Sequence, residues 1–430
     1  MEKGSKIYND FVSILREELI PAQGCTEPIA LALAAARARE LLGCIPDEVK
    51  VEASGSVIKN VKSVIVPNTD HLKGIPAAVA AGIIAGHSDK GLEVIADATA
   101  EDAAAMKAFI ESTPIEVEAM SRGPVFDQII TLKAGEHCSR VRIANFHTNI
   151  VLEEKDGEVI TSKPVENDSS EGLTDRSQLN MENIWDFITT CDIGDVKPVL
   201  ERQVKYNMAI AQEGLKGNYG ANIGRVLLDT YGEGDVKIRA KAWAAAGSDA
   251  RMNGCEMPVI VNSGSGNQGI TCSVPVVIYA KEYNAGDEKL YRALALSNLT
   301  AIHQKDGIGR LSAFCGAVSA GAGAGAGIAY LTDGDYQAVI HTVVNSLAIV
   351  AGIVCDGAKA SCAAKIAASV DAAILALNMY RRGQEFHGGD GLVVKGVENT
   401  INNISRLGSE GMKETNDEII KMMCHGGQVH

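Results

Sequence analysis

The sequence predicts an α+β protein, in which a mixed α/β domain over residues 1–165 precedes a mostly helical domain over residues 175–430. Between about residues 48 and 160, short β-branched runs alternate with Gly, Asp and Asn turns, as strands do. Beyond residue 178, longer segments of helical composition dominate. Aromatic residues make up only 4% of the chain and glycine occurs 44 times, so we expect helices that pack closely through small side chains.

Two helices are predicted at the start of the chain, over residues 5–19 and 27–42. In the second helix, Thr26 is the expected N-cap, Pro28 lies in the first turn and Gly43 follows the last turn. Further helical pieces are expected near residues 75–85 and 100–111. The expected strands have the sequences EVKVEAS, GLEVIADA, FDQIITLKA, SRVRIANF and TNIVLEEKDGEVITS.

The stretch TSKPVENDSSEGLTDRSQ, residues 161–178, is polar and rich in turn formers, so it is the expected linker between the two domains. The domain that follows should be mostly helical, with glycine-rich joints. Its expected helices cover residues 180–192, 195–216, 238–250, 288–304, 337–354, 358–380 and 409–424.

The formal charge of −14 and the pI near 5.2 disfavour binding to nucleic acid or to an anionic membrane surface, both of which attract basic clusters. We therefore expect a small-molecule partner, and a homo-oligomer is compatible with the sequence. The N-terminus lacks the apolar core of a signal peptide, which predicts a cytoplasmic location. The uncharged stretch 337–355 contains His341, Asn345 and Ser346, so a buried core helix is expected there instead of a membrane span.

Ten cysteines without an export signal are not expected to form a disulfide framework. Cys25 directly precedes a predicted helix, and Cys355 precedes Asp356, a good N-cap for another. A thiol at a helix N-terminus is favoured as thiolate by the helix dipole. Cys315 adjoins a glycine run that permits close backbone approach, so these three cysteines could converge on one cluster. No C-x-x-C pair is present, and a buried apolar role is the alternative for each thiol.

The stretch MPVIVNSGSGNQGI spaces Gly264, Gly266 and Gly269 as in the dinucleotide fingerprint. That fingerprint needs a helix directly after it and then a second strand, whereas TCSVPVVIYAKEY, with Pro275 inside it, follows here. We therefore expect no NAD. A polar loop that holds a small anion such as a carboxylate fits better. Its members would be Asn262, Ser263, Gly264, Ser265, Gly266, Asn267 and Gln268.

The stretches GCTEPIALA, VPNTDHLKGIPAA, MPVIVNSGSGNQGI, SAFCGAVSAGAG and CDGAKASCAAKIA together resemble the L-cysteine desulfidase family over most of the chain. The C-terminal half is also similar to the α domain of iron–sulfur L-serine dehydratases. The resemblance implies an oxygen-sensitive [4Fe–4S] cluster held by three cysteines, with one iron open to substrate. At the matching positions the ligands would be Cys25, Cys315 and Cys355, and Cys362 is the alternative for the third place.

The resemblance also implies a reaction, the elimination of sulfide from L-cysteine to give pyruvate and ammonia. The open iron would polarise the leaving group while a base takes the Cα proton, so no pyridoxal phosphate (PLP) is needed. L-Serine dehydration on the same cluster is the alternative activity, and a non-catalytic amino-acid-binding protein is the alternative of another class. Cysteine should be preferred because a thiolate is a softer iron ligand than a hydroxyl.

Three residues are candidates for the base: Lys359 beside Cys355, and His71 and His387 in glycine-containing loops. By the resemblance, Asn68 and Thr69 would contact substrate, although a plain turn uses the same residue types. The remaining cysteines are assigned to packing or to the surface, and they are Cys44, Cys138, Cys191, Cys255, Cys272 and Cys424.

Overall fold

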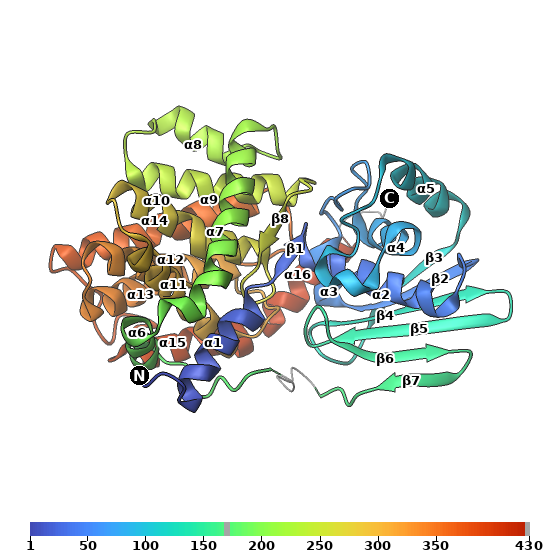
Figure 1. The fold of residues 1–430 in the computed structure, drawn as a ribbon, viewed down its shortest axis with the longest axis horizontal. Helices are drawn as coiled ribbons and strands as arrows, with labels where there is room; N and C mark the ends of the chain where they lie inside the picture. The colour runs from blue at the N-terminus through green and yellow to red at the C-terminus, as the bar shows by residue number, and fades with distance from the viewer. Residues whose placement is uncertain (167–172, 426–430) are drawn as a thin grey trace.

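A sheet lobe and a helical lobe lie side by side in the computed structural model, which describes residues 1–166 and 173–425 (Figure 1). The sheet lobe carries four helices above a six-stranded sheet, and the helical lobe contains the rest of the long helices. The predicted α+β class is confirmed. The expected linker falls partly outside the described residues, so the domain boundary between residues 165 and 175 stays a prediction.

The strand order in the sheet is β3-β2-β4-β5-β6-β7. Strands β2 and β3 are parallel and all other neighbours are antiparallel. One face of the sheet is buried. Alternate residues of β2 lie on this face, and two of them, Val49 and Val51, are at most 2% exposed. The strand bounds are Glu48–Ser54 (β2), Ile115–Met120 (β3), Asp127–Ala134 (β4), His137–Ala144 (β5), Ile150–Lys155 (β6) and Glu158–Ser162 (β7).

The strand predicted for GLEVIADA is wrong. Gly91 adopts a left-handed φ of 54°, and the N–H of Lys90 donates to the carbonyl of His87 at 3.1 Å in the 3-10 turn over Ser88–Glu93 (η1). The β-branched residues Val94 and Ile95 are buried in the core instead of paired in a ladder. One edge of the sheet is formed by β3, a mostly exposed strand that the sequence analysis did not predict.

Helix α2 packs on the sheet and α4 packs on α2. This second contact is close, because a Cβ at Gly82 would lie 2.2 Å from the carbonyl oxygen of Ala32. The predicted helices at 27–42, 75–85 and 100–111 are confirmed. Their bounds, with those of one short unpredicted helix, are Thr26–Leu42 (α2), Gly55–Val61 (α3), Gly74–Ala85 (α4) and Ala100–Ser112 (α5).

Helix α12 lies at the centre of the helical lobe, where it contacts α10, α11, α13 and α14. A Cβ at Gly323 would lie 2.4 Å from the carbonyl oxygen of Ser297, so glycine sets the spacing between α12 and α11. The bounds in this lobe are Met181–Thr190 (α6), Ile193–Lys216 (α7), Ile223–Tyr231 (α8), Val236–Met252 (α9), Gly266–Glu282 (α10), Asp287–Ile308 (α11), Gly316–Thr332 (α12), Tyr336–Val350 (α13), Cys362–Arg381 (α14), Val397–Arg406 (α15) and Leu407–Gly411 (η2).

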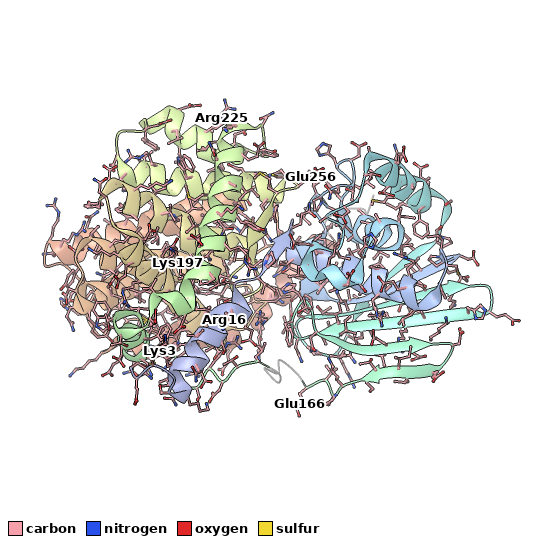
Figure 2. All side chains as sticks on the ribbon, viewed as in Figure 1. Lys3, Arg16, Glu166, Lys197, Arg225 and Glu256 are labelled. Atoms are coloured by element: carbon pink, nitrogen blue, oxygen red, sulfur yellow. The ribbon has the colours of Figure 1, made fainter. Side chains whose placement is uncertain are left out.

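Three connections tie the lobes together. Helix α1 (Lys6–Glu18), which carries Arg16, lies along the helical lobe (Figure 2). There Phe11 stacks on Phe187 at 5.2 Å, and Arg16 donates to the carbonyl of Asp195. The short strands β1 (Pro21–Gln23) and β8 (Pro258–Ile260) pair antiparallel. Helix α16 (Lys413–His425) packs against α3, and Lys59 Nζ donates to Asn416 Oδ1 at 2.8 Å.

Residues 337–350 belong to a core helix as predicted, since α13 packs against α12, α14 and α15, whereas residues 351–355 form a turn and a loop. Among the described residues, one helix has the length and apolar character that a membrane span requires, namely α14 (Cys362–Arg381). More than half of its apolar window is buried inside the fold, where α14 contacts α9, α12 and α13.

Candidate active site

Four cysteines from distant parts of the chain line one cavity of about 100 Å³. Cys25 is the N-cap of α2 and Cys315 is the N-cap of α12. Cys355 follows α13 in a loop, and Cys362 is the first residue of α14. The convergence of Cys25, Cys315 and Cys355 that the sequence suggested is therefore present, with Cys362 beside them.

Cys315 and Cys355 are brought together by a short antiparallel bridge between Phe314 and Val354. The N–H of Cys315 donates to the carbonyl of Ile353 at 3.1 Å, and the N–H of Cys355 donates to the carbonyl of Ala313 at 2.6 Å. In this register the two cysteines occupy diagonal positions on one face, for which the Cα atoms are typically about 7–8 Å apart.

An iron–sulfur cluster suits this donor set, because each cysteine can then bind a different iron. Among residues 1–166 and 173–425, no three His, Cys, Asp or Glu side chains lie close enough to hold one ion. Four thiols facing one cavity are soft ligands of the type that iron–sulfur clusters take. The chemistry of the donors therefore fits a cluster.

Two expectations about the cysteines are corrected. The N-cap of α2 is Cys25 and not Thr26, whose hydroxyl instead donates to the carbonyl of Gly264 at 2.7 Å. Cys355 does not stand at a helix N-terminus, because α14 begins only at Cys362. The reason is local: Gly357 has a left-handed φ of 90°, and the Asp356 carboxylate pairs with lysines instead of capping a helix.

Burial raises the pKa of Cys25, Cys315 and Cys362, which for Cys25 is opposite to the expected effect of the helix dipole. Burial raises the pKa of Cys25 well above its usual value, and its Sγ donates to Glu27 Oε2 at 3.2 Å. Burial, with the neighbouring Cys355, raises the pKa of Cys315 to about 12. Burial also raises the pKa of Cys362. Metal binding would displace these protons.

The polar loop begins with a tight turn, in which Asn262 and Ser265 exchange two backbone hydrogen bonds of 3.1 and 3.0 Å. Ser263 and Gly264 carry the positive φ angles of 49° and 75° that this turn requires. Helix α10 starts directly afterwards at Gly266, contrary to the sequence analysis. The dinucleotide context is still missing, since β8 pairs antiparallel with β1 and the next element after α10 is a helix.

Most of the predicted loop residues face the cysteines. Those that line the cavity are Ser263, Gly264, Ser265, Asn267 and Gln268. Asn262 is not among them, because its Nδ2 donates to Asn298 Oδ1 at 2.9 Å inside the helical lobe. Gly266 is also absent from the cavity lining, and it packs against the guanidinium of Arg251.

Charged residues that the sequence analysis missed complete the cavity, and they are Glu27, His147, Arg251, Lys305 and Arg310. Burial alone would raise the pKa of Glu27, but the contacts with His147 and Cys25 lower it to about 2. His147 Nε2 lies 3.7 Å from Glu27 Oε1. Lys305, on the last turn of α11, is 5% exposed, and burial lowers its pKa to about 8. Glu27 lies within the stretch GCTEPIALA, whereas the other four stand in no recognisable motif and depend on burial for their significance.

None of the three predicted bases lines the cavity. Lys359 Nζ pairs with Asp356 Oδ1 at 2.5 Å. His71 is exposed in a turn with a φ of 65°, and the His387 side chain is 74% exposed beside Glu385. We therefore do not retain Lys359, His71 and His387 as candidate bases.

Asn68 and Thr69 also lie away from the cysteine cavity. Asn68 Nδ2 donates to the carbonyl of Ile95 at 2.8 Å, and Thr69 Oγ1 donates to the carbonyl of Val66 at 2.7 Å. Both side chains therefore stabilise the local turn through hydrogen bonds to backbone carbonyls. Five of the six remaining cysteines are absent from the cavity lining, namely Cys44, Cys138, Cys191, Cys255 and Cys272, and the side chain of Cys424 lies outside the described part of the chain.

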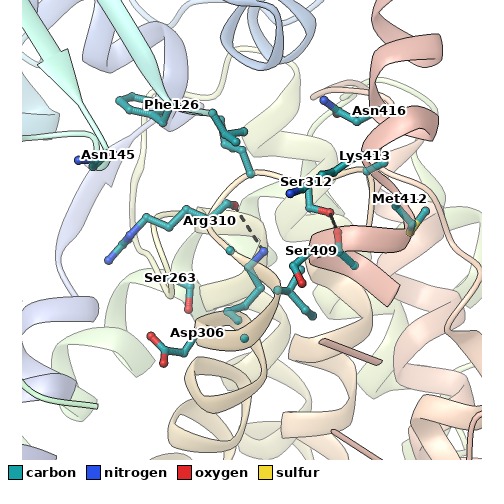
Figure 3. Close-up of a pocket in the computed structure, with 18 of the residues that line it drawn as sticks. Phe126, Asn145, Ser263, Asp306, Arg310, Ser312, Ser409, Met412, Lys413 and Asn416 are labelled. Atoms are coloured by element: carbon teal, nitrogen blue, oxygen red, sulfur yellow. Dashed lines mark hydrogen bonds between the residues drawn. The ribbon is translucent and has the colours of Figure 1, made fainter. Parts of the chain in front are cut away.

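A larger cavity of about 640 Å³ adjoins the first, and the two share residues such as Ser263, Lys305 and Arg310. Figure 3 shows Phe126 and Asn145 of the sheet lobe on one side of it and Lys413 and Asn416 of α16 on another. Because the lining is shared, a small molecule in the larger cavity lies next to the cysteines.

Comparison with known proteins identifies the family. The family model for the serine dehydratase alpha chain matches residues 89–421. The chain belongs to this family, which indicates a lyase, and the predicted relation to the α domain of L-serine dehydratases is confirmed. Among its relatives, a UPF0597 protein of Desulfitobacterium hafniense is 58% identical over 425 residues, with 99% of each chain covered. UPF0597 proteins of Lachnoclostridium phytofermentans and Treponema denticola are 52% and 47% identical, with at least 97% of each chain covered.

Proposed function

We propose that the protein is an iron–sulfur-dependent lyase that acts on L-cysteine. Loss of the Cα proton and departure of sulfide from Cβ give hydrogen sulfide and aminoacrylate, and water then converts aminoacrylate to pyruvate and ammonia. The observation that carries the proposal is the convergence of Cys25, Cys315, Cys355 and Cys362 on one cavity in a serine dehydratase-like chain.

In this proposal Cys25, Cys315 and Cys355 hold a [4Fe–4S] cluster, and Cys362 is the alternative third ligand. When bound, the cluster supplies an open iron that acts as a Lewis acid on the leaving group. The charges around the cavity support an anionic group there, because Arg251, Lys305 and Arg310 all contribute to its lining. Neither PLP nor NAD is required.

Lys305 is the base that the geometry favours. Its ammonium group is buried where the two cavities meet, and it donates a hydrogen bond to the carbonyl of Arg310 at 3.4 Å. A lysine in such an environment releases its proton more readily than an exposed lysine, so its neutral Nζ can accept the substrate's Cα proton. Ser263, Ser265, Asn267 and Gln268 then line the space for the amino acid.

L-Serine is the second candidate substrate, and the description of the matching family favours it. L-Cysteine remains our first choice because its thiolate is the softer ligand. For partners, we propose a small amino acid, with no nucleic acid and no membrane. A cytoplasmic location and a homo-oligomer stay predictions.

The test is an anaerobic assay with matched L-cysteine and L-serine, which follows pyruvate in both and sulfide in the first. We expect faster pyruvate release from L-cysteine, with one sulfide for each pyruvate. Faster release from L-serine would refute the desulfidase assignment and favour the dehydratase. If neither amino acid yields pyruvate although one of them binds, the protein is a non-catalytic amino-acid-binding protein.

A further inference from the structure

Arg251 is a buried cation without a counter-ion. It lies in the last turn of α9, is 2% exposed and lines the cysteine cavity. Its Nη1 donates to Asn267 Oδ1 at 3.2 Å, whereas its Nε and Nη2 have no hydrogen-bond partner among the described residues. No carboxylate in the described part of the chain pairs with it. An unpaired buried charge is costly, so its retention calls for an explanation.

The two free nitrogens form one edge of the guanidinium, and this edge binds carboxylates with two parallel hydrogen bonds. The same protein contains an example. Arg142 uses the same two atoms to hold the buried carboxylate of Asp127, with Nε at 2.9 Å from Oδ1 and Nη2 at 2.6 Å from Oδ2. The free edge of Arg251 therefore has the donor pattern for a carboxylate that the protein itself does not supply.

The surroundings of Arg251 favour an anion further. A Cβ at Gly266 would lie 2.3 Å from Arg251 Nε, so only glycine lets the guanidinium lie against the start of α10. The first N–H groups of a helix have no intrahelical partners and carry the positive end of the helix dipole. The guanidinium and the start of this 17-residue helix thus meet at the cavity that the cysteines line.

We infer that Arg251 binds the carboxylate of the amino-acid substrate through Nε and Nη2. This inference rests on the proposed function, because it names the residue that would hold the substrate of that reaction. Asn267 positions the guanidinium through Nη1, and the bound amino acid would lie between Arg251 and the cysteines.

The test measures binding of L-alanine, which has the carboxylate and ammonium groups but no leaving group. Titration calorimetry on anaerobically purified protein compares the wild type with Arg251→Gln, Arg251→Lys and the matched control Arg16→Gln on the exposed side of α1. We expect Arg251→Gln to raise the dissociation constant roughly 10- to 100-fold, the effect of losing charged hydrogen bonds. The dissociation constant of Arg251→Lys should lie between those of the wild type and Arg251→Gln, because lysine keeps the positive charge but cannot donate two parallel hydrogen bonds. Arg16→Gln should bind as the wild type does.

Ethylamine, which lacks the carboxylate, provides the second comparison. The wild type should bind it much more weakly than L-alanine, and Arg251→Gln should bind both equally weakly. Unchanged L-alanine affinity in the variants would overturn the inference. Loss of iron from Arg251→Gln would also overturn the inference, because the guanidinium would then stabilise the cluster instead of binding the substrate. If Arg251→Gln does not fold, the affinity of Arg251→Lys for L-alanine takes its place, and an affinity equal to that of the wild type overturns the inference.

The inference and the proposed function can fail separately. A wild type that makes no pyruvate but binds L-alanine through Arg251 would refute the lyase and leave the carboxylate site intact. A wild type that makes pyruvate, with variants that bind L-alanine normally, would refute only the role of Arg251.

Discussion

Asp249 provides a sharp test of the energetics of helix α9, which also carries Arg251. Its side chain is fully buried, and its Oδ2 accepts a hydrogen bond from the N–H of Gly224 at 3.0 Å. Its Oδ1 has no partner among the described residues. Burial raises the pKa of Asp249 from 3.8 to about 7, so the folded protein prefers the protonated carboxyl.

The sign of the pH dependence follows from the two pKa values. Between the unfolded value of 3.8 and the folded value of about 7, the folded state holds a proton that the unfolded state has lost. The stability contributed by this group is therefore present at low pH and is lost as the pH rises toward 7. At about 1.4 kcal/mol for each pKa unit, the loss between pH 5 and pH 8 is at most about 3 kcal/mol, less any screening by solvent.

Asp249→Asn keeps the shape and an acceptor for Gly224 but carries no charge. We expect its free energy of unfolding, relative to the wild type, to rise by about 2–3 kcal/mol from pH 5 to pH 8. Urea unfolding followed by circular dichroism at both pH values measures this difference. A difference that stays constant, or that falls as the pH rises, would refute the reasoning.

Two further predictions concern the base and the core. Lys305→Met should lower the rate of pyruvate formation by roughly 10²–10⁴-fold, as loss of a general base does, whereas Lys359→Met, outside the cavity, should leave it near the wild-type rate. Similar losses for both variants would contradict the assignment. Gly323→Ala should lower the free energy of unfolding by about 1–3 kcal/mol, because its Cβ would lie 2.4 Å from the Ser297 carbonyl. Gly352→Ala, with no atom within 4 Å of its Cβ, is the control, and equal effects in urea unfolding would count against this packing argument.

The sequence predicts elements well where local preference and burial agree. Strands β4 and β5 and helices α1 and α2 have strong patterns and form as expected. Helices α10 and α12 were missed because Pro275 and the glycines of α12 disfavour a helix locally. Both helices are almost completely buried, and tertiary packing overrides that preference.

Among the site residues, too, some could be predicted from the sequence and others could not. The cysteines stand in recognisable motifs, so their convergence could be anticipated. Arg251, Lys305 and His147 could not be found in this way, because an isolated basic residue is usually exposed and only the fold buries these three. For Lys359, the sequence suggested a position in the first turn of a helix. That helix begins only at Cys362, because Gly357 adopts a left-handed φ, so Lys359 lies in the preceding loop.

Iron and acid-labile sulfide in protein purified without oxygen test the central claim most directly. We predict about four of each per chain, which the formula of the cluster requires. Alanine at Cys25, Cys315 or Cys355 should abolish most of both, while Cys362→Ala should retain them. Cys272→Ala, a buried cysteine outside the cavity, is the matched control and should also retain them. A wild type without iron, or variants at Cys315 and Cys355 that keep their full iron content, would contradict the account.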